Sequence, residues 1–375
     1  SMHLVAKAGL EGNRLSADMS LLEGRGKLAL NASYDLATEV YGADLSIDSL
    51  QLHHFLPQDS LYELTLHAAA KGRGIDFTSK RTVADASLQL DALQYGKWYL
   101  SGVNLKAGVK SALASVNVSS DNALLEMQAV ANMRLDRKYL DGSANLNVDR
   151  VGLYELGLVP ERLVRPLAFR LEGEVRSDTA RMELSAGDLN LWLRAQGTVD
   201  KLMQQGNQFA ELLMKQVEDR KLDHVALRRA LPTAGMFIKA GKDNPVNDLL
   251  AQYHMGFNEL KLSFGFTPER GINGRSSIHG LHTDSLLLDT IFFAVHQDTT
   301  RIKLQSGVIN NDRNPQIVFR STLTGEIRSE DAELTLDFED ERGEKGILFG
   351  INARPLSEGN GNCLLYTSPS PRDTR

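Results

Sequence analysis

Apolar and polar residues alternate with a period of two through most of this chain, and this pattern constrains the fold more than any other feature. Residues 63–68 read Glu-Leu-Thr-Leu-His-Ala, and many other segments repeat the pattern. Successive side chains of a β-strand point to opposite faces, so each segment has one apolar face and one polar face. Turn signals such as residues 24–26, 72–74 and 310–312 separate the segments. The sequence therefore predicts a mainly β fold.

The period changes once, in the middle of the chain. Strands are predicted over residues 1–198, a helical insert over 199–255, and a second β-region over 256–362. In the insert, Leu202, Phe209 and Leu213 fall on one helical stripe, and Asn244-Pro245 is a helix-start signal. In the second β-region, the predicted strands cover residues 260–266, 285–295, 301–307, 316–323 and 332–338.

A short element recurs in the first β-region. Residues 43–50, 86–93 and 144–151 each place alanine, leucine and a further aliphatic residue on one face of a strand, and an aspartate follows. Weaker copies lie at residues 195–200 and 332–337. The spacing is uneven, which argues against a strict solenoid. We expect the aspartate to help close each strand.

The last stretch of the chain is predicted to be foreign to the protein. Residues 363–373, Cys-Leu-Leu-Tyr-Thr-Ser-Pro-Ser-Pro-Arg-Asp, resemble a translated sequencing adapter, so residues 363–375 are set aside as a non-native tail. The tail contains the only cysteine, Cys363. Without it, disulfides, thiolate metal sites and a cysteine nucleophile are excluded, and we expect the true ends of the protein to lie elsewhere.

Composition and motifs give little sign of chemistry. The net charge of −6 argues against a nucleic-acid-binding protein. His53-His54 lacks a third ligand at useful spacing, and His279 and His282 fit exposed strand positions better than a metal or acid–base site. Nucleotide-binding loops, nucleophile elbows and metalloprotease motifs are absent from the sequence. We therefore expect a protein that is not an enzyme and has no metal or cofactor.

The apolar strand face has two possible roles. It can pack against a second sheet as the core of a β-sandwich, or it can line an open groove. Its residues are mostly Ala, Leu, Val and Ile, which suit the acyl chains of lipids because each sheltered methylene contributes about 0.8 kcal/mol. The pattern alone leaves both roles open and favours the sandwich.

Several stretches resemble the TamB family, within the AsmA-like group of Gram-negative envelope proteins. They are residues 55–62, 71–76, 93–102 and 120–122, together with Leu231-Pro232 and residues 241–245 of the helical insert. The resemblance implies a long, twisted, antiparallel-rich β-sheet folded into a taco-shaped groove with an aliphatic interior. It further implies a periplasmic location, an inner-membrane anchor outside this chain, an outer-membrane barrel protein as partner, and phospholipid transport between the membranes.

From the alternation and the resemblance together, we predict which side chains line the groove and contact phospholipid acyl chains. The candidates are Leu28, Leu30, Leu45, Ile47, Leu64, Leu66, Leu88, Leu90, Leu146 and Val148. The alternative is a structural or adhesive β-sandwich array that binds protein or glycan. A continuous open apolar face favours the groove, and a closed core favours the array.

Overall fold

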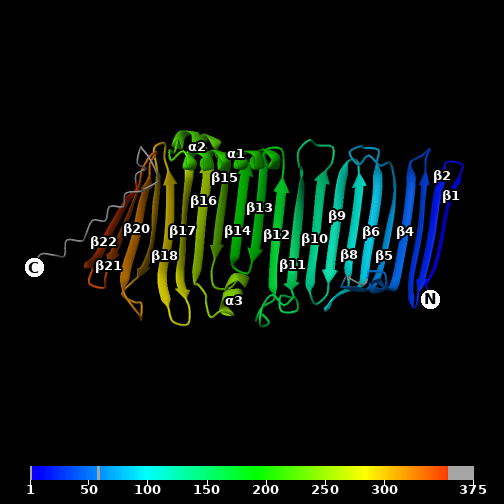
Figure 1. The fold of residues 1–375 in the computed structure, drawn as a ribbon, viewed down its shortest axis with the longest axis horizontal. Helices are drawn as coiled ribbons and strands as arrows, with labels where there is room; N and C mark the ends of the chain where they lie inside the picture. The colour runs from blue at the N-terminus through cyan, green and yellow to red at the C-terminus, as the bar shows by residue number, and fades with distance from the viewer. Residues whose placement is uncertain (1, 57–59, 354–375) are drawn as a thin grey trace, which may run out of the picture. The chain divides into compact units, whose positions relative to one another are not determined.

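The computed structural model describes residues 2–56 and 60–353 and divides the chain into two compact units, residues 1–176 and 177–375 (Figure 1). Strands hold 59% of the chain and helices 11%, and the strand pairing is antiparallel. The predicted mainly β fold, with its antiparallel sheet and helical insert, is confirmed. The adapter-like tail and residues 57–59 of the first family-like stretch lie outside the described residues.

Unit 1 is a meander in which each strand pairs with its neighbour along the chain. The short strand β7 pairs with the end of β6, and β8 pairs with the rest of β6. Extensive contacts in this unit join hydrogen-bonded neighbours, apart from those of the 3₁₀ helix η1 with β5. Among the described residues of unit 1, no second sheet covers the first. The elements are β1 (Met2–Glu11), β2 (Arg14–Glu23), β3 (Gly26–Asp35), β4 (Val40–Gln51), η1 (Leu52–His54), β5 (Leu61–Arg73), β6 (Val83–Tyr95), β7 (Trp98–Leu100), β8 (Val103–Lys110), β9 (Leu113–Asp121), β10 (Leu125–Arg134), β11 (Gly142–Val151) and β12 (Leu167–Val175).

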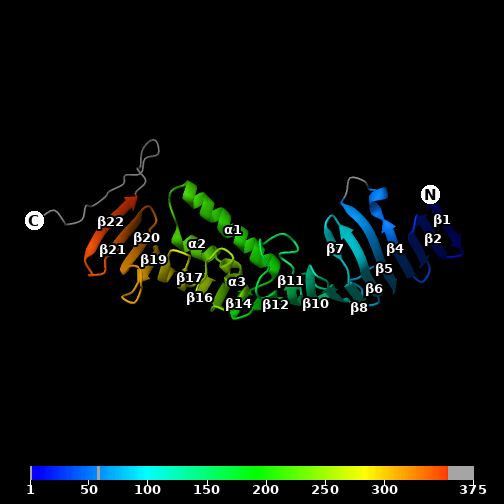
Figure 2. The ribbon, with the colours of Figure 1, turned by 90° about the horizontal axis from the view of Figure 1, so that it is seen from below.

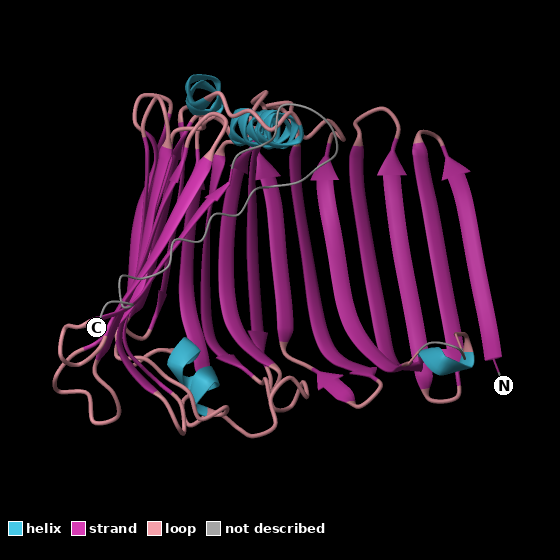
Figure 3. Cartoon of the chain, turned by 60° about the vertical axis from the view of Figure 1, so that its left-hand side comes forward, coloured by secondary structure: helices cyan, strands magenta, loops and turns pink. Residues whose placement is uncertain are grey.

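Unit 2 has the same meander with helices added. Figures 1 and 3 place α1 and α2 along one end of its strands and α3 at the opposite end. Figure 2 looks along the strands and shows the curvature of the sheet in this unit. The elements are β13 (Thr179–Ala186), β14 (Leu189–Gln196), α1 (Val199–Glu218), α2 (His224–Ala230), β15 (Ala234–Ala240), α3 (Pro245–Ala251), β16 (Glu259–Thr267), β17 (Gly271–His282), β18 (Leu287–Gln297), β19 (Ile302–Asn310), β20 (Phe319–Ile327), β21 (Ala332–Glu339) and β22 (Lys345–Ala353).

The predicted helical insert needs one correction. Residues 199–255 do hold the three α-helices, but strand β15 lies among them and pairs with both β14 and β16. The helix starts are as predicted: Asn244 accepts a hydrogen bond from the Asn247 N–H at 3.1 Å, and Pro245 is the first helical residue. The insert is therefore two excursions from the sheet, one on each side of β15.

Buried polar groups fix the second excursion. Asp188, at the β13–β14 turn, accepts backbone hydrogen bonds from Gly241 and Asp243 and one from the Asn244 side chain. The Asn247 amide bonds to the carbonyl of Phe257 and accepts from its N–H. These bonds attach α3 to the strand ends and give residues 241–245 a structural role.

The repeated element of unit 1 also needs a correction, because its aspartate does not end the strand. In β6, Leu90 and Ala92 lie opposite the consecutive residues Leu66 and Thr65, so Asp91 is an extra residue in a β-bulge. Asp149 occupies the same place in β11. In β4 the bulge falls at Asp48 and Ser49, where Ser49 has φ 50°. Each strand continues past its bulge, because a strand can accommodate an extra residue and then resume pairing with the same neighbouring strand.

Apart from Ala112 in the β8–β9 turn, the most buried apolar side chains of unit 1 lie at or near these bulges. Leu50, Ala92 and Val148 are 4%, 6% and 4% exposed. A bulge bends its strand and increases the local twist, so this end of the sheet curls over its own side chains. The small core of unit 1 is at this end.

Candidate functional site

The strand register of unit 1 aligns the apolar side chains into rows that cross the strands. Directly opposed residues of an antiparallel pair share one face of the sheet, so a row can be followed from strand to strand. The first row runs beside the bulges, and only Ser120 interrupts its apolar character. It consists of Leu4, Leu21, Leu28, Ile47, Leu66, Leu90, Val103, Ser120, Met127, Val148 and Phe169.

A second row lies two residues further along each strand. It is aliphatic throughout, apart from Met19. It consists of Ala6, Met19, Leu30, Leu45, Ala68, Leu88, Leu105, Val118, Ala129, Leu146 and Leu171.

A third row is alanine at every position except Val116 and Gly173. Its residues leave the backbone less covered than the leucines of the second row do. It consists of Ala8, Ala17, Ala32, Ala43, Ala70, Ala86, Ala107, Val116, Ala131, Ala144 and Gly173. We call the three rows together the apolar face.

All ten predicted lining residues lie on the side of the sheet that carries these rows. Nine belong to the first and second rows, and Leu64 lies just beyond the first row, opposite Leu50 and Leu93. The alanine row is not among the predicted lining residues. The signal was present, because the repeated elements begin with Ala43, Ala86 and Ala144, which the register places in that row.

Exposure increases across the apolar face, away from the bulges. Ile47 and Val148 in the first row are buried, and the leucines of the second row are half-buried. In the third row, Ala43, Ala86 and Ala144 are exposed, and the other residues of β3–β12 are half-buried. A core packed between two sheets would bury all three rows alike. The face is therefore most covered beside the bulges and least covered along the alanine row.

The opposite face of unit 1 is polar. The residues between the first and second rows illustrate its character: Val5, Ser20, Ala29, Ser46, His67, Gln89, Asn104, Ser119, Gln128, Asn147 and Arg170.

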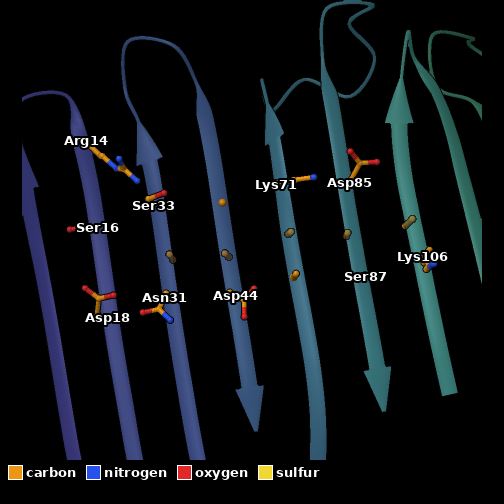
Figure 4. Close-up of a pocket in the computed structure, with 17 residues that line it drawn as sticks. Arg14, Ser16, Asp18, Asn31, Ser33, Asp44, Lys71, Asp85, Ser87 and Lys106 are labelled. Carbon is orange, nitrogen blue, oxygen red and sulfur yellow. The ribbon is translucent and has the colours of Figure 1, made fainter. Parts of the chain in front are cut away.

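The polar face carries a hollow of about 730 Å³ across β2–β8. Figure 4 shows charged side chains of both signs around it, among them Asp44, Lys71, Asp85 and Lys106. Ala32, Ala43 and their neighbours in the third row lie between these polar positions and form the floor of the hollow. None of the ten predicted lining residues contributes to it, so the hollow meets the apolar face only at the alanines of the third row.

The apolar face of unit 2 is more aromatic. Phe264 and Phe293 stack with ring centroids 6.4 Å apart, and two serines and two glycines interrupt its aliphatic residues. One row consists of Leu184, Leu191, Ile238, Leu262, Ser276, Phe293, Ser306, Leu323 and Leu336, and the next of Met182, Leu193, Met236, Phe264, Gly274, Val295, Leu304, Gly325 and Leu334.

The rings of His53 and His54 lie with centroids 4.1 Å apart, and the other two histidines weighed in the sequence analysis have partners of their own. His54 pairs with Glu23 at 2.5 Å, His279 with the Thr290 hydroxyl at 3.1 Å, and the Nδ1 of His282 lies 3.0 Å from the Gly280 carbonyl. Across residues 2–56 and 60–353, no three His, Cys, Asp or Glu side chains gather in a way that could hold a metal ion.

One cluster of charged groups in unit 2 lies at the β18–β19 and β20–β21 turns. The pKa of the Asp298 carboxyl lies well below its usual range, chiefly because it accepts hydrogen bonds from the backbone and hydroxyl of Thr300. Arg301 and Arg328 both bond to Glu326 and hold its pKa low. These ionised groups lie at or next to turns, and neither apolar row of unit 2 contains a charged residue.

Fold and site together define a class: single-layer antiparallel β-sheet units with one apolar and one polar face. No protein-family model, curated protein or solved structure matches this chain. None of the helices in the described part of the chain combines the length and the apolar character that a membrane-spanning helix needs.

Proposed function

We propose that the apolar face is a groove that shelters phospholipid acyl chains and that the chain belongs to a lipid-transport protein of the bacterial envelope. The observation that supports this most is the continuity of the three rows from β1 to β12, open along the alanine edge. Acyl chains need dry surface without hydrogen-bonding groups, and shelter contributes about 0.8 kcal/mol per methylene. Ten sheltered methylenes would offset about 8 kcal/mol of the cost of leaving a bilayer.

The rows suit the movement of an acyl chain along the sheet as well as its binding. They present the same kind of surface at each strand, and strands lie about 4.8 Å apart. An acyl chain can shift by one strand and meet almost the same contacts, because the apolar attraction is non-directional. A surface of this kind has no single deep site in which a lipid would be held.

The wider setting rests on the resemblance to TamB. That family suggests a periplasmic position between the two membranes, an inner-membrane anchor outside this chain, a barrel protein of the outer membrane as partner, and a contribution to outer-membrane assembly. These parts of the proposal depend on residues 55–62, 93–102 and the other family-like stretches.

The proposal is tested with vesicles containing a phospholipid that carries a photoreactive acyl chain. Leu45→Asp and Leu88→Asp together place two carboxylates on the second row, two strands apart. Losing the shelter of one leucine costs about 1.5–3 kcal/mol, and 1.4 kcal/mol is tenfold in affinity. We expect lipid adducts to fall about tenfold or more.

The matched control is Ser46→Asp with Ser87→Asp, the neighbouring residues on the same two strands and on the polar face. It should label like the unmodified chain. Circular dichroism establishes that both variants keep their strands. Equal labelling of the two folded variants would refute the groove.

A second candidate function is a surface module that binds protein or glycan, and the hollow on the polar face favours it. Its mixed charges and hydroxyls can form many hydrogen bonds with a polar ligand. Lys71→Ala with Lys106→Ala would weaken such binding on a glycan array and leave lipid labelling unchanged.

A further inference from the structure

The connection between β14 and β15 takes an unusually long path. The two strands are direct neighbours, with Leu191 opposite Ile238. Between them, residues 197–233 leave the sheet as α1, reach the turn between β20 and β21, and return as α2. A hairpin of adjacent strands needs only a few residues, so the path requires another explanation.

The near end of this segment is tied to the sheet at two points. The Gly197 N–H donates to the Asp178 carbonyl at 2.7 Å, and the Gln196 N–H donates to the Thr233 carbonyl at 2.9 Å. Thr198 caps α1 by accepting from the Lys201 N–H at 3.3 Å. The first turn of α1 therefore has a fixed position beside β13, β14 and β15.

The far end is tied to the β20–β21 turn. The Leu222 N–H donates to the Ser329 carbonyl at 2.7 Å, and the Ser329 hydroxyl donates to the Leu222 carbonyl at 2.8 Å. Lys221 forms an ion pair with Glu330 at 2.9 Å. We call these four residues the clasp.

The segment between the ties is stiff. α1 has 20 residues, or about 30 Å of helix. It ends in a Schellman motif, in which the Lys221 and Arg220 N–H groups bond to the carbonyls of Gln216 and Val217. From β15 to β20 there are five strand spacings, or about 24 Å along the sheet. The helix is thus long enough to bridge that part of the sheet as one rigid bar.

We propose that α1 and the clasp form a strap that sets the curvature of the unit 2 sheet. Opening the clasp lets the sheet flatten, so that the distance between β14 and β20 increases. The clasp has two hydrogen bonds and one exposed ion pair, a number that permits reversible opening. The strap regulates the access of lipid to the apolar rows of unit 2, and this role rests on the lipid-binding function proposed above. The mechanical claim stands on the geometry of unit 2.

The test measures a distance across the sheet of the whole chain. Spin labels are attached through p-acetylphenylalanine at Arg194 on β14 and Thr324 on β20, both exposed. Ser329→Ala with Glu330→Lys removes the hydroxyl bond and repels Lys221. We expect the label distance to lengthen and its distribution to broaden relative to the unmodified chain.

Glu341→Lys, in the β21–β22 turn, is the control for the added charge and should leave the distribution unchanged. An unchanged distribution in the clasp variant would overturn the strap. A variant that loses its strands is replaced by a locked form, Leu222→Cys with Ser329→Cys and Cys363→Ser. Its oxidised state should give a narrower distribution than its reduced state, and equal distributions would overturn the strap in the same way.

Lipid labelling of the same variants separates the two proposals. If both are correct, opening the clasp changes labelling by a photoreactive residue at Leu262 in unit 2 and leaves labelling at Leu30 in unit 1 unchanged. A distance change without labelling at either position supports the strap and refutes the lipid function. Labelling without a distance change supports the lipid function and refutes the strap.

Discussion

Single residues decide where the strands of unit 1 bend. Asp91 and Asp149 lie in bulges, and each accepts a side-chain hydrogen bond from the residue two positions earlier, Gln89 and Asn147 respectively. The sequence marks these aspartates through the repeat, but it does not predict a bulge. A bulge is a relation between two paired strands, and the sequence of one strand does not contain it.

Asp298 allows a prediction about pH at the residue scale. Its pKa is lowered in the folded chain, so its ionised form stabilises the fold above the unfolded value near 3.8, and the effect is lost as pH falls below that value. Asp298→Asn should therefore lower the free energy of unfolding at pH 7 and pH 5 by the same amount, and by less at pH 3. Urea unfolding at the three pH values measures this, and a difference that does not shrink at pH 3 would contradict it.

At the scale of elements, packing against a neighbouring strand can make a segment a strand even where its own sequence lacks the alternation pattern. No predicted strand range covers β17, although His279 and His282 were expected at strand positions, because residues 271–282 contain glycines and serines where apolar residues would be expected. The side chain of Phe264 in β16 fills the space over Gly274. The paired strand thus supplies the apolar surface that β17 lacks, which explains why its own sequence predicts it poorly.

This pairing predicts a difference between two glycines. A Cβ at Gly274 would overlap the Phe264 ring, whereas a Cβ at Gly265 would meet nothing within 4 Å. Gly274→Ala should lower the free energy of unfolding by about 1–3 kcal/mol. Gly265→Ala should leave it nearly unchanged or raise it slightly. Thermal and urea unfolding of the two variants compare them directly, and equal effects would show that Phe264 does not need the space.

At the scale of the whole molecule, the main feature is an apolar sheet face in unit 1 that no second sheet covers in the described residues. Alternation correctly predicted which side chains share a face, including all ten candidate residues. It could not decide between a sandwich and a single layer, because a strand has the same pattern whether a second sheet or a ligand covers it. The structure of unit 1 is a single layer in its described part, and exposure rises from Val148 in the first row to Ala144 in the third.

A photocrosslinking scan along β5 tests the central claim most directly. A photoreactive amino acid is placed in turn at each of residues 64–71, and the chain is exposed to phospholipid vesicles and irradiated. Residues 64, 66, 68 and 70 lie on the apolar face, and residues 65, 67, 69 and 71 on the polar face. The account predicts phospholipid adducts at the even positions and few at the odd ones. Equal adducts at both sets, or none at the even positions, would contradict it.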